Sequence, residues 1–193
     1  MKRNLLLFAA LVFITIAKAQ LTTVWEKSAG SSYSWFTTSS SNTTGCAYNP
    51  VTNKLLLADR NNLIAIINVT TGASEGTLTT TPFVGTESFK WNKIRITSDG
   101  VIYGVSLTTA SPFLCKIYRW ENQTASPTLC ASFNASERCG DAFGLSGSGN
   151  NTVLYVSGNG ITSSSVNIYV LTTANETDFS LSNTINIPIT GTN

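Results

Sequence analysis

Residues 93–105 decide the fold: they read KIRITSDGVIYGV, two short runs rich in β-branched and aromatic residues on either side of Ser98-Asp99-Gly100. Such runs favour strands, and Asp-Gly supplies the positive backbone angle that a tight hairpin needs. Two more strands are expected downstream, at residues 114–120 and 128–133. No window after residue 20 shows a helical period of apolar residues. This part of the chain is therefore predicted to be a meander of four strands.

The same four-strand pattern occurs before and after this stretch. The second strands begin at Leu55, Val101 and Val153, at offsets of 46 and 52 residues. A four-stranded unit repeated about every 40–50 residues is the signature of β-propeller blades. We predict an all-β chain, a β-propeller-like array of about three to four four-stranded blades; a β-sandwich is the alternative. The predicted blades span approximately 45–81, 90–133 and 140–188.

The number of blades raises a problem of closure. Propellers close with about four to eight blades, and this chain offers three, plus a lone strand near residues 22–28. An open arc exposes an apolar face at each end, and such faces are association surfaces. Three solutions stay open: the chain is an incomplete propeller cut from a longer protein, it closes with another copy, or residues 22–36 supply most of a fourth blade. We favour the first.

The N-terminus has the pattern of a secretory signal peptide. Two cations precede an apolar run from Leu5 to Ile16, and Ala17-Lys18-Ala19 forms a small-x-small cleavage site. The alternative is an uncleaved anchor, but about a dozen apolar residues fall short of the roughly 20 that cross a bilayer. We expect cleavage after Ala19, a single domain at residues 20–193, secretion to the extracellular space or cell surface, and no membrane span in the mature chain.

Charge and composition exclude several functions. The net charge is +2 for the whole chain, and removal of the three cations in residues 1–19 leaves nine basic against ten acidic residues. Such a balance argues against binding of nucleic acid. The chain has no His, which removes His-based catalysis and His metal sites. We predict no catalytic residues, no metal and no cofactor.

Four cysteines in an exported chain indicate disulfides. They are Cys46, Cys115, Cys130 and Cys139, at spacings of 69, 15 and 9 residues. Zinc is a weaker alternative, because no CxxC spacing and no His are present. Cys115 and Cys130 fall on neighbouring predicted strands, which favours their pairing, and Cys46 with Cys139 follows by elimination.

Six Asn-x-Ser/Thr sequons are candidate sites of N-glycosylation in a secreted chain. Their number is close to that expected by chance from the Asn, Ser and Thr content. The asparagines are Asn42, Asn68, Asn122, Asn134, Asn150 and Asn175.

A ligand site is expected at the loops that enter the innermost strands, because these loops surround a propeller axis. Trp91 is a candidate to stack on a sugar, and Arg138 with Asp141 could orient hydroxyl groups. The alternative is structural: Trp91 packs between blades, and Arg138 pairs with Asp141. The full set of candidate ligand-binding residues is Glu87, Lys90, Trp91, Asn92, Arg138 and Asp141.

Short motifs in a fixed order suggest a family. They are Trp25-Glu26-Lys27-Ser28, Trp35-Phe36, Ala47-Tyr48-Asn49-Pro50, Ser98-Asp99-Gly100-Val101-Ile102-Tyr103 with Leu107-Thr108-Thr109, Lys116-Ile117-Tyr118-Arg119-Trp120, and Gly140-Asp141-Ala142-Phe143. The series resembles a family of secreted, functionally uncharacterised β-propeller-type domains common in bacterial secretomes. The resemblance spans nearly all of the mature chain, and the greater length of its members implies that this chain is a fragment. The four cysteines depart from the family pattern, as does Lys93, where an acidic residue is commoner. The family offers no catalytic residues to carry over.

Three functions follow. The first is a secreted, non-catalytic binding module whose ligand is a glycan or another surface protein. The second, from another class, is a structural surface, matrix or filament subunit that self-associates through its open blade faces. The third and weakest is a carbohydrate-active enzyme that uses Asp141 with a neighbouring acid.

Overall fold

The computed structural model describes residues 22–30, 33–36, 42–60, 63–87, 89–158 and 165–189; the predicted signal peptide at residues 1–19 lies outside them. The described chain forms three four-stranded antiparallel sheets, each a meander in chain order. The first sheet contains β1 (Thr43–Asn49), β2 (Lys54–Asp59), β3 (Leu63–Asn68) and β4 (Ser74–Thr77). The second contains β5 (Phe89–Ile96), β6 (Ile102–Leu107), β7 (Phe113–Trp120) and β8 (Thr128–Ala135). The third contains β9 (Cys139–Ser146), β10 (Val153–Gly158), β11 (Ser165–Thr173) and β12 (Phe179–Pro188), with the 3-10 turn η1 (Gly149–Asn151) between β9 and β10.

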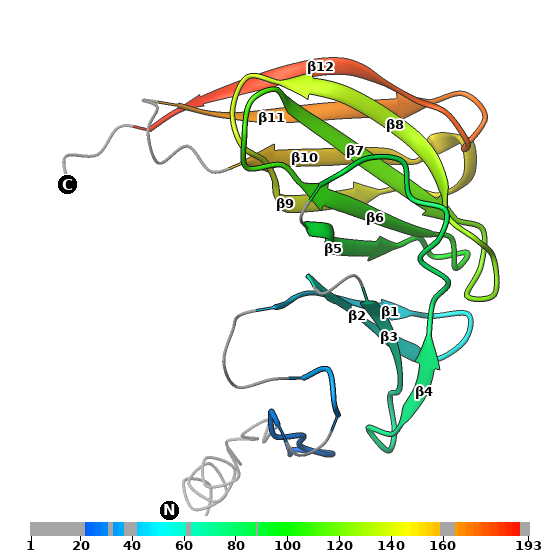
Figure 1. Ribbon diagram of the computed structural model, residues 1–193. Coiled ribbons are helices and arrows are strands. Elements are labelled where there is room, and N and C mark those ends of the chain that lie inside the picture. The colour runs from blue at the N-terminus through cyan, green and yellow to red at the C-terminus, as the bar shows by residue number, and fades with distance from the viewer. Residues whose placement is uncertain are drawn as a thin grey trace, which may run out of the picture.

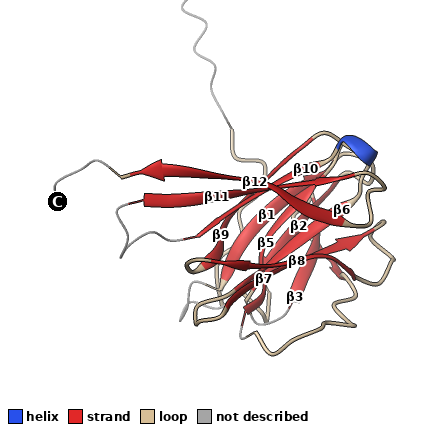
Figure 2. Ribbon diagram, turned by 90° about the horizontal axis from the view of Figure 1, so that it is seen from above, coloured by secondary structure: helices blue, strands red, loops and turns tan. Residues whose placement is uncertain are grey.

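The three sheets follow one another as propeller blades do (Figure 1). The first strand of each sheet is innermost, so that β1 contacts β5 and β5 contacts β9. Figure 2 shows that strands make up almost all of the regular structure. Two separate cores lie between successive sheets, whereas a sandwich has two sheets around one core. The predicted propeller-like fold class is confirmed, and the β-sandwich alternative is excluded.

The hairpin that joins β5 to β6 has the predicted turn. Gly100 adopts φ +92°, in the left-handed region that glycine enters without steric cost. The Gly100 amide donates to the Thr97 carbonyl at 3.1 Å, and the Thr97 hydroxyl donates to the Asp99 carboxylate. The side chain and the glycine together fix the register of the hairpin.

Aromatic rings fill the core between the first and second sheets. Trp91 and Trp120 lie 5.0 Å apart between ring centroids, and Trp91 and Tyr118 lie 5.2 Å apart, both edge to face. Such pairs add about 0.5–1.5 kcal/mol beyond burial of their area. Gly104 makes room for them, because a Cβ there would lie 3.0 Å from the Trp120 ring.

The core between the second and third sheets is mainly aliphatic. It joins Val105 and Ile117 of the second sheet to Leu154 and Val156 of the third, and all four side chains are fully buried. β6 is buried at all six of its positions, because its two faces point into the two different cores. The second sheet is therefore the centre of the array.

One polar side chain connects all three sheets. Asn92, on β5, is fully buried, and its Nδ2 donates to the Gly140 carbonyl of β9 at 2.6 Å. Its Oδ1 accepts from the Thr44 hydroxyl of β1 at 3.2 Å and from Nε of Arg60, the residue after β2, at 2.8 Å. A buried amide satisfied on both ends fixes the relative positions of its neighbours.

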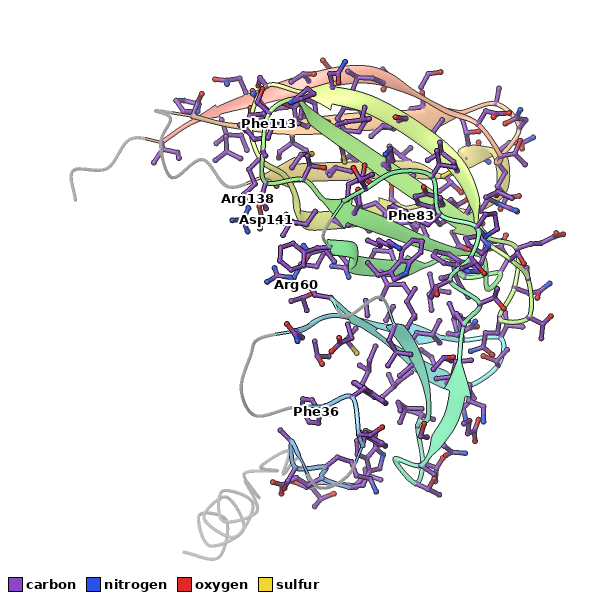
Figure 3. All side chains as sticks on the ribbon, viewed as in Figure 1. Phe36, Arg60, Phe83, Phe113, Arg138 and Asp141 are labelled. Carbon is purple, nitrogen blue, oxygen red and sulfur yellow. The ribbon has the colours of Figure 1, made fainter. Side chains whose placement is uncertain are left out.

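The lone strand predicted near residues 22–28 is wrong, because these residues form no strand. Residues 22–30 and 33–36 lie instead over the outer face of the first sheet. There the Trp25 indole donates to the Val69 carbonyl at 2.7 Å, and the Tyr33 hydroxyl donates to the Gly72 carbonyl. Figure 3 shows Phe36 on the side of the first sheet that faces away from the second. Ile67 on that face is fully buried. The segment covers an apolar face without adding a blade.

The outer face of the third sheet has no such cover in the described part of the chain. Strand register places its apolar side chains on one face, because Val166 pairs with Ile187, Ile168 with Ile185, and Tyr155 with Val170. Ile185 and Ile187 are 44% and 45% exposed. The prediction of two open faces is therefore corrected to one, on the third sheet.

Replacement of Asn92 with Ala should lower the free energy of unfolding by about 2–4 kcal/mol, because it leaves the Gly140 carbonyl and the Arg60 and Thr44 donors without their buried partner. Urea unfolding followed by tryptophan fluorescence measures the loss. Asn134, exposed on β8, gives the matched control, and Asn134→Ala should change stability by less than about 0.5 kcal/mol. Equal effects of the two substitutions would show that Asn92 does not tie the sheets together.

Candidate functional site

The six predicted ligand-binding residues do not form one site. Trp91 is fully buried, with its ring packed between Phe83, Tyr118 and Trp120 at centroid distances of 5.0–5.2 Å. No face of the indole is left for a sugar. Trp91 therefore has the structural role, packing between blades, that was the alternative interpretation of the sequence.

Glu87 and Lys90 lie away from the axis. Glu87 forms an ion pair with Lys116, and the two side chains are only 10% and 8% exposed. Glu87 and Lys116 line a cavity of about 400 Å³ beside the loop that joins β6 to β7. The Lys90 ammonium lies 5.2 Å from the centroid of the Phe83 ring. Figure 3 shows Phe83 far from Arg138 and Asp141.

Asn92, Arg138 and Asp141 do lie at one end of the inner strands. Arg138 holds Asp141 in a two-point ion pair, with Nε 2.7 Å from Oδ2 and Nη2 2.5 Å from Oδ1. The Asp141 carboxylate raises the pKa of Arg138, against the opposing effect of burial. Both oxygens of Asp141 are engaged by this arginine. Asp141 is thus part of a structural pair, which argues against its use as an acid catalyst.

A cavity of about 570 Å³ opens beside the innermost strands, where all three sheets contribute side chains. Its size is within the range of small-molecule sites, about 300–1,000 Å³. We call it the axial pocket. Its lining includes hydroxyl groups, an aromatic ring, a thiol and two cations, from Thr44, Cys46, Lys93, Arg95, Tyr155 and Ser157.

The axial pocket is electropositive. Its lining contains Lys93 and Arg95 and no carboxylate, and the nearby Asp141 is held by Arg138. Burial, reinforced by Arg60 and Arg95, lowers the pKa of Lys93, while Asp141 acts in the opposite direction. Because Lys93 is partly buried and lies near two other cations, an anionic ligand would stabilise its charged form.

Prediction from the sequence missed Lys93 and Arg95 as site residues. The available signal was the alternation Lys93-Ile94-Arg95-Ile96 in an innermost strand. Side chains alternate between faces with a period of two, so both cations share one face while Ile94 points into the core with the first sheet. The prediction placed the site in the loops that enter the innermost strands, whereas Lys93 and Arg95 lie within strand β5.

The lining of the axial pocket lacks the carboxyl pair that glycoside hydrolysis requires. Glycoside hydrolysis needs two carboxyl groups about 5–10 Å apart, and the axial pocket has none in its lining. Among the described residues, no group of three or more His, Cys, Asp or Glu is placed to hold a metal ion. In the same residues, no helix has the length and apolarity that a membrane crossing requires.

The structure contains no disulfide between Cys115 and Cys130, and it shows the four cysteines in the reduced state. Cys115 on β7 pairs with Phe133 rather than with Cys130, and a β-bulge follows Ile117. The Cys130 thiol donates to the Ile117 carbonyl at 3.3 Å. The prediction failed because the strand register cannot be obtained from the spacing of 15 residues.

The pairing of Cys46 with Cys139, reached by elimination, is not present either. Cys46 is exposed on β1 of the first sheet, whereas Cys139 is buried at the beginning of β9. Partial burial raises the pKa of the Cys46 thiol, and Arg95 opposes that effect.

The six sequon asparagines differ in accessibility. Asn42 and Asn68 are partly buried, and the Asn68 side chain accepts from the Thr70 amide at 3.0 Å. The remaining four are exposed, on strand β8 or in turns: Asn122, Asn134, Asn150 and Asn175.

No protein-family model and no curated protein matches the sequence. Among solved structures, the chain is similar to a DUF4623 family protein from Bacteroides eggerthii DSM 20697, with a TM-score of 0.62 and 21% identity over 81% of this chain. The match covers 37% of that protein. A second similarity is to the WD40 domain of Toxoplasma gondii coronin, at 12% identity, with coverage of 72% of this chain and 34% of that one; its TM-score is only 0.39. The first similarity supports the fold alone.

The exposed thiol in the axial pocket allows a direct test of access. The folded, reduced protein should react with one equivalent of maleimide, at Cys46, because Cys115, Cys130 and Cys139 are buried. Mass spectrometry of the native protein counts the labels. Cys46→Ser should take up none and Cys130→Ser should still take up one. Rapid labelling at a buried cysteine would contradict the described packing.

Proposed function

We propose that this chain is a secreted, non-catalytic propeller-type binding module that takes an acidic glycan into the axial pocket. The observation that carries the proposal is the pair of cations, Lys93 and Arg95, in a cavity of about 570 Å³ whose lining has no carboxylate. Secretion rests on the signal pattern of residues 1–19. The fold and the absence of paired carboxylates at the pocket agree with a binding role.

The lining suits a sugar that carries a carboxylate. Arg95 and Lys93 can donate charge-assisted hydrogen bonds to the anion, which are about twice as strong as neutral ones. The hydroxyl groups of Thr44 and Ser157 can hydrogen-bond sugar hydroxyls, and Tyr155 offers an amphipathic ring. Lys93 is held in position by its Nζ, which donates to the Thr44 carbonyl at 2.6 Å. Preorganised donors of this kind reduce the entropic cost of binding.

Binding should depend on charge at the axial pocket. Isothermal titration calorimetry should show that a tetrasaccharide of galacturonic acid binds and an uncharged tetrasaccharide of glucose does not. Arg95→Gln should weaken binding about tenfold, as expected from the loss of one charge-assisted hydrogen bond of about 1.5 kcal/mol. Lys54, on β2 and paired with Glu75 at 2.6 Å, is the control, and Lys54→Gln should bind like the parent. Equal binding of both sugars, or equal losses in the two variants, would refute the proposal.

The open face of the third sheet supports a second function, as a self-associating structural subunit. Its exposed apolar side chains include Ile185 and Ile187, whereas Tyr155 and Ile168 on the same face line the axial pocket. The first sheet's outer face is already covered by residues 22–30 and 33–36, so the third sheet of one copy cannot stack on the first sheet of another. The mode left is a twofold dimer in which two third sheets pack face to face.

Light scattering coupled to size exclusion tests this second function. The parent should be dimeric at tens of micromolar, and the double variant Ile185→Arg, Ile187→Arg should be monomeric, because it places charge within the interface. Val51, 64% exposed in the turn between β1 and β2, gives the control, and Val51→Arg should leave the dimer intact. A parent that stays monomeric at all concentrations would eliminate this function and leave the binding proposal unaffected.

A further inference from the structure

Two cysteines that are distant in the sequence meet between the second and third sheets. Cys115, on β7, and Cys139, the first residue of β9, are both fully buried. They belong to the same core cluster, and their strands are in contact. Cys139 is the neighbour that most strongly raises the pKa of the Cys115 thiol. The two sulfur atoms are therefore neighbours within one apolar core.

Backbone pairing holds the two cysteines in this position. Cys139 forms an isolated β-bridge with Thr108, with hydrogen bonds of 3.0 Å from the Thr108 amide and 3.3 Å from the Cys139 amide. The Thr108 hydroxyl donates to the carbonyl of Leu114 at 2.7 Å, directly before Cys115. Thr108 thus connects the two cysteine-bearing segments.

Glycine at position 140 makes this close approach possible. Gly140 has φ +102°, and a Cβ there would collide with the carbonyl oxygen of Ser106 on β6. The residue after Cys139 can therefore pass next to the second sheet only without a side chain. The local chain is shaped to bring Cys139 against the second sheet, where Cys115 lies.

Both thiols are shielded from solvent and lie next to each other in the core. Both lack solvent exposure, which excludes a role as a surface nucleophile, and no metal-binding group of residues is found in the described chain. The neighbouring Cys139 thiol, together with burial, raises the pKa of Cys115 well above its usual value, so that reactive thiolate is scarce in the folded state.

We propose that Cys115 and Cys139 are joined by a disulfide that staples the third sheet to the second, while Cys46 and Cys130 remain thiols. Each cysteine loses one proton, the pair loses two electrons, and a disulfide-bearing oxidant is reduced to two thiols as the S–S bond forms. An oxidising compartment outside the cell would supply such an oxidant. This inference does not depend on the glycan proposal, because it concerns stability and connectivity alone.

Peptide mapping tests the connectivity. The reduced full chain is refolded in the presence of oxidised glutathione, alkylated, digested without reduction and analysed by mass spectrometry. The expected result is one cross-linked peptide pair containing Cys115 and Cys139, with Cys46 and Cys130 recovered as alkylated thiols or as glutathione adducts. A cross-link between any other two cysteines, or four cysteines without an internal cross-link, overturns the proposal.

Thermal melting with and without reductant provides a second measurement. A disulfide that closes the loop from Cys115 to Cys139 should raise the Tm of the oxidised chain by roughly 5–10 °C. Reduction of the disulfide should remove that increase. Cys130→Ser, at a buried cysteine outside the pair, should keep the reductant-sensitive shift, whereas Cys139→Ser should lose it. A shift that persists in Cys139→Ser contradicts the proposal; if that variant does not fold, the peptide map of the parent decides.

Discussion

Each four-stranded sheet in this protein has two faces to cover, and that constraint shapes the whole chain. Three sheets in a row create two interfaces, so the second sheet is covered on both sides and the first and third on one side each. Burial of apolar surface contributes about 25 cal/mol per Å², which makes an uncovered sheet face costly. The first sheet solves the problem with Trp25, Tyr33 and Phe36, which lie over Leu57 and Ile67. The third sheet presents its apolar face outward.

Polar side chains lie where the innermost strands β1, β5 and β9 contact one another. Asn92 of β5 links the three sheets there by hydrogen bonds. Residues that follow Asn92 on the same strand line the axial pocket. Lys93 and Arg95 point to the pocket, while Ile94 fills the core behind them. One strand therefore supplies the connection between blades, part of the core and the charge of the candidate site.

The repeat allowed prediction of the fold but not of the contacts between repeats. The Ser98-Asp99-Gly100 turn and the four-strand pattern depend on local conformational preferences, which are present in the sequence. Other features depend on which sheet faces pack against each other. These are the packing of Trp91, the pairing of the cysteines and the position of residues 22–28. A tryptophan at the edge of a strand has the same sequence signature whether it packs on another blade or stacks on a sugar. The register of β7 on β8 places Phe133, not Cys130, opposite Cys115, and no spacing rule reveals that register.

Hydrogen exchange resolved by strand tests the central claim, that the second sheet is the doubly covered centre of a radial array with one open end. Slowest exchange is expected for the amides of β6 and β7, intermediate exchange for β10, and fast exchange for β12, whose residues after Phe179 are exposed. Protection that is as high in β12 as in β6, or that is highest in the first sheet, would contradict this arrangement of the sheets.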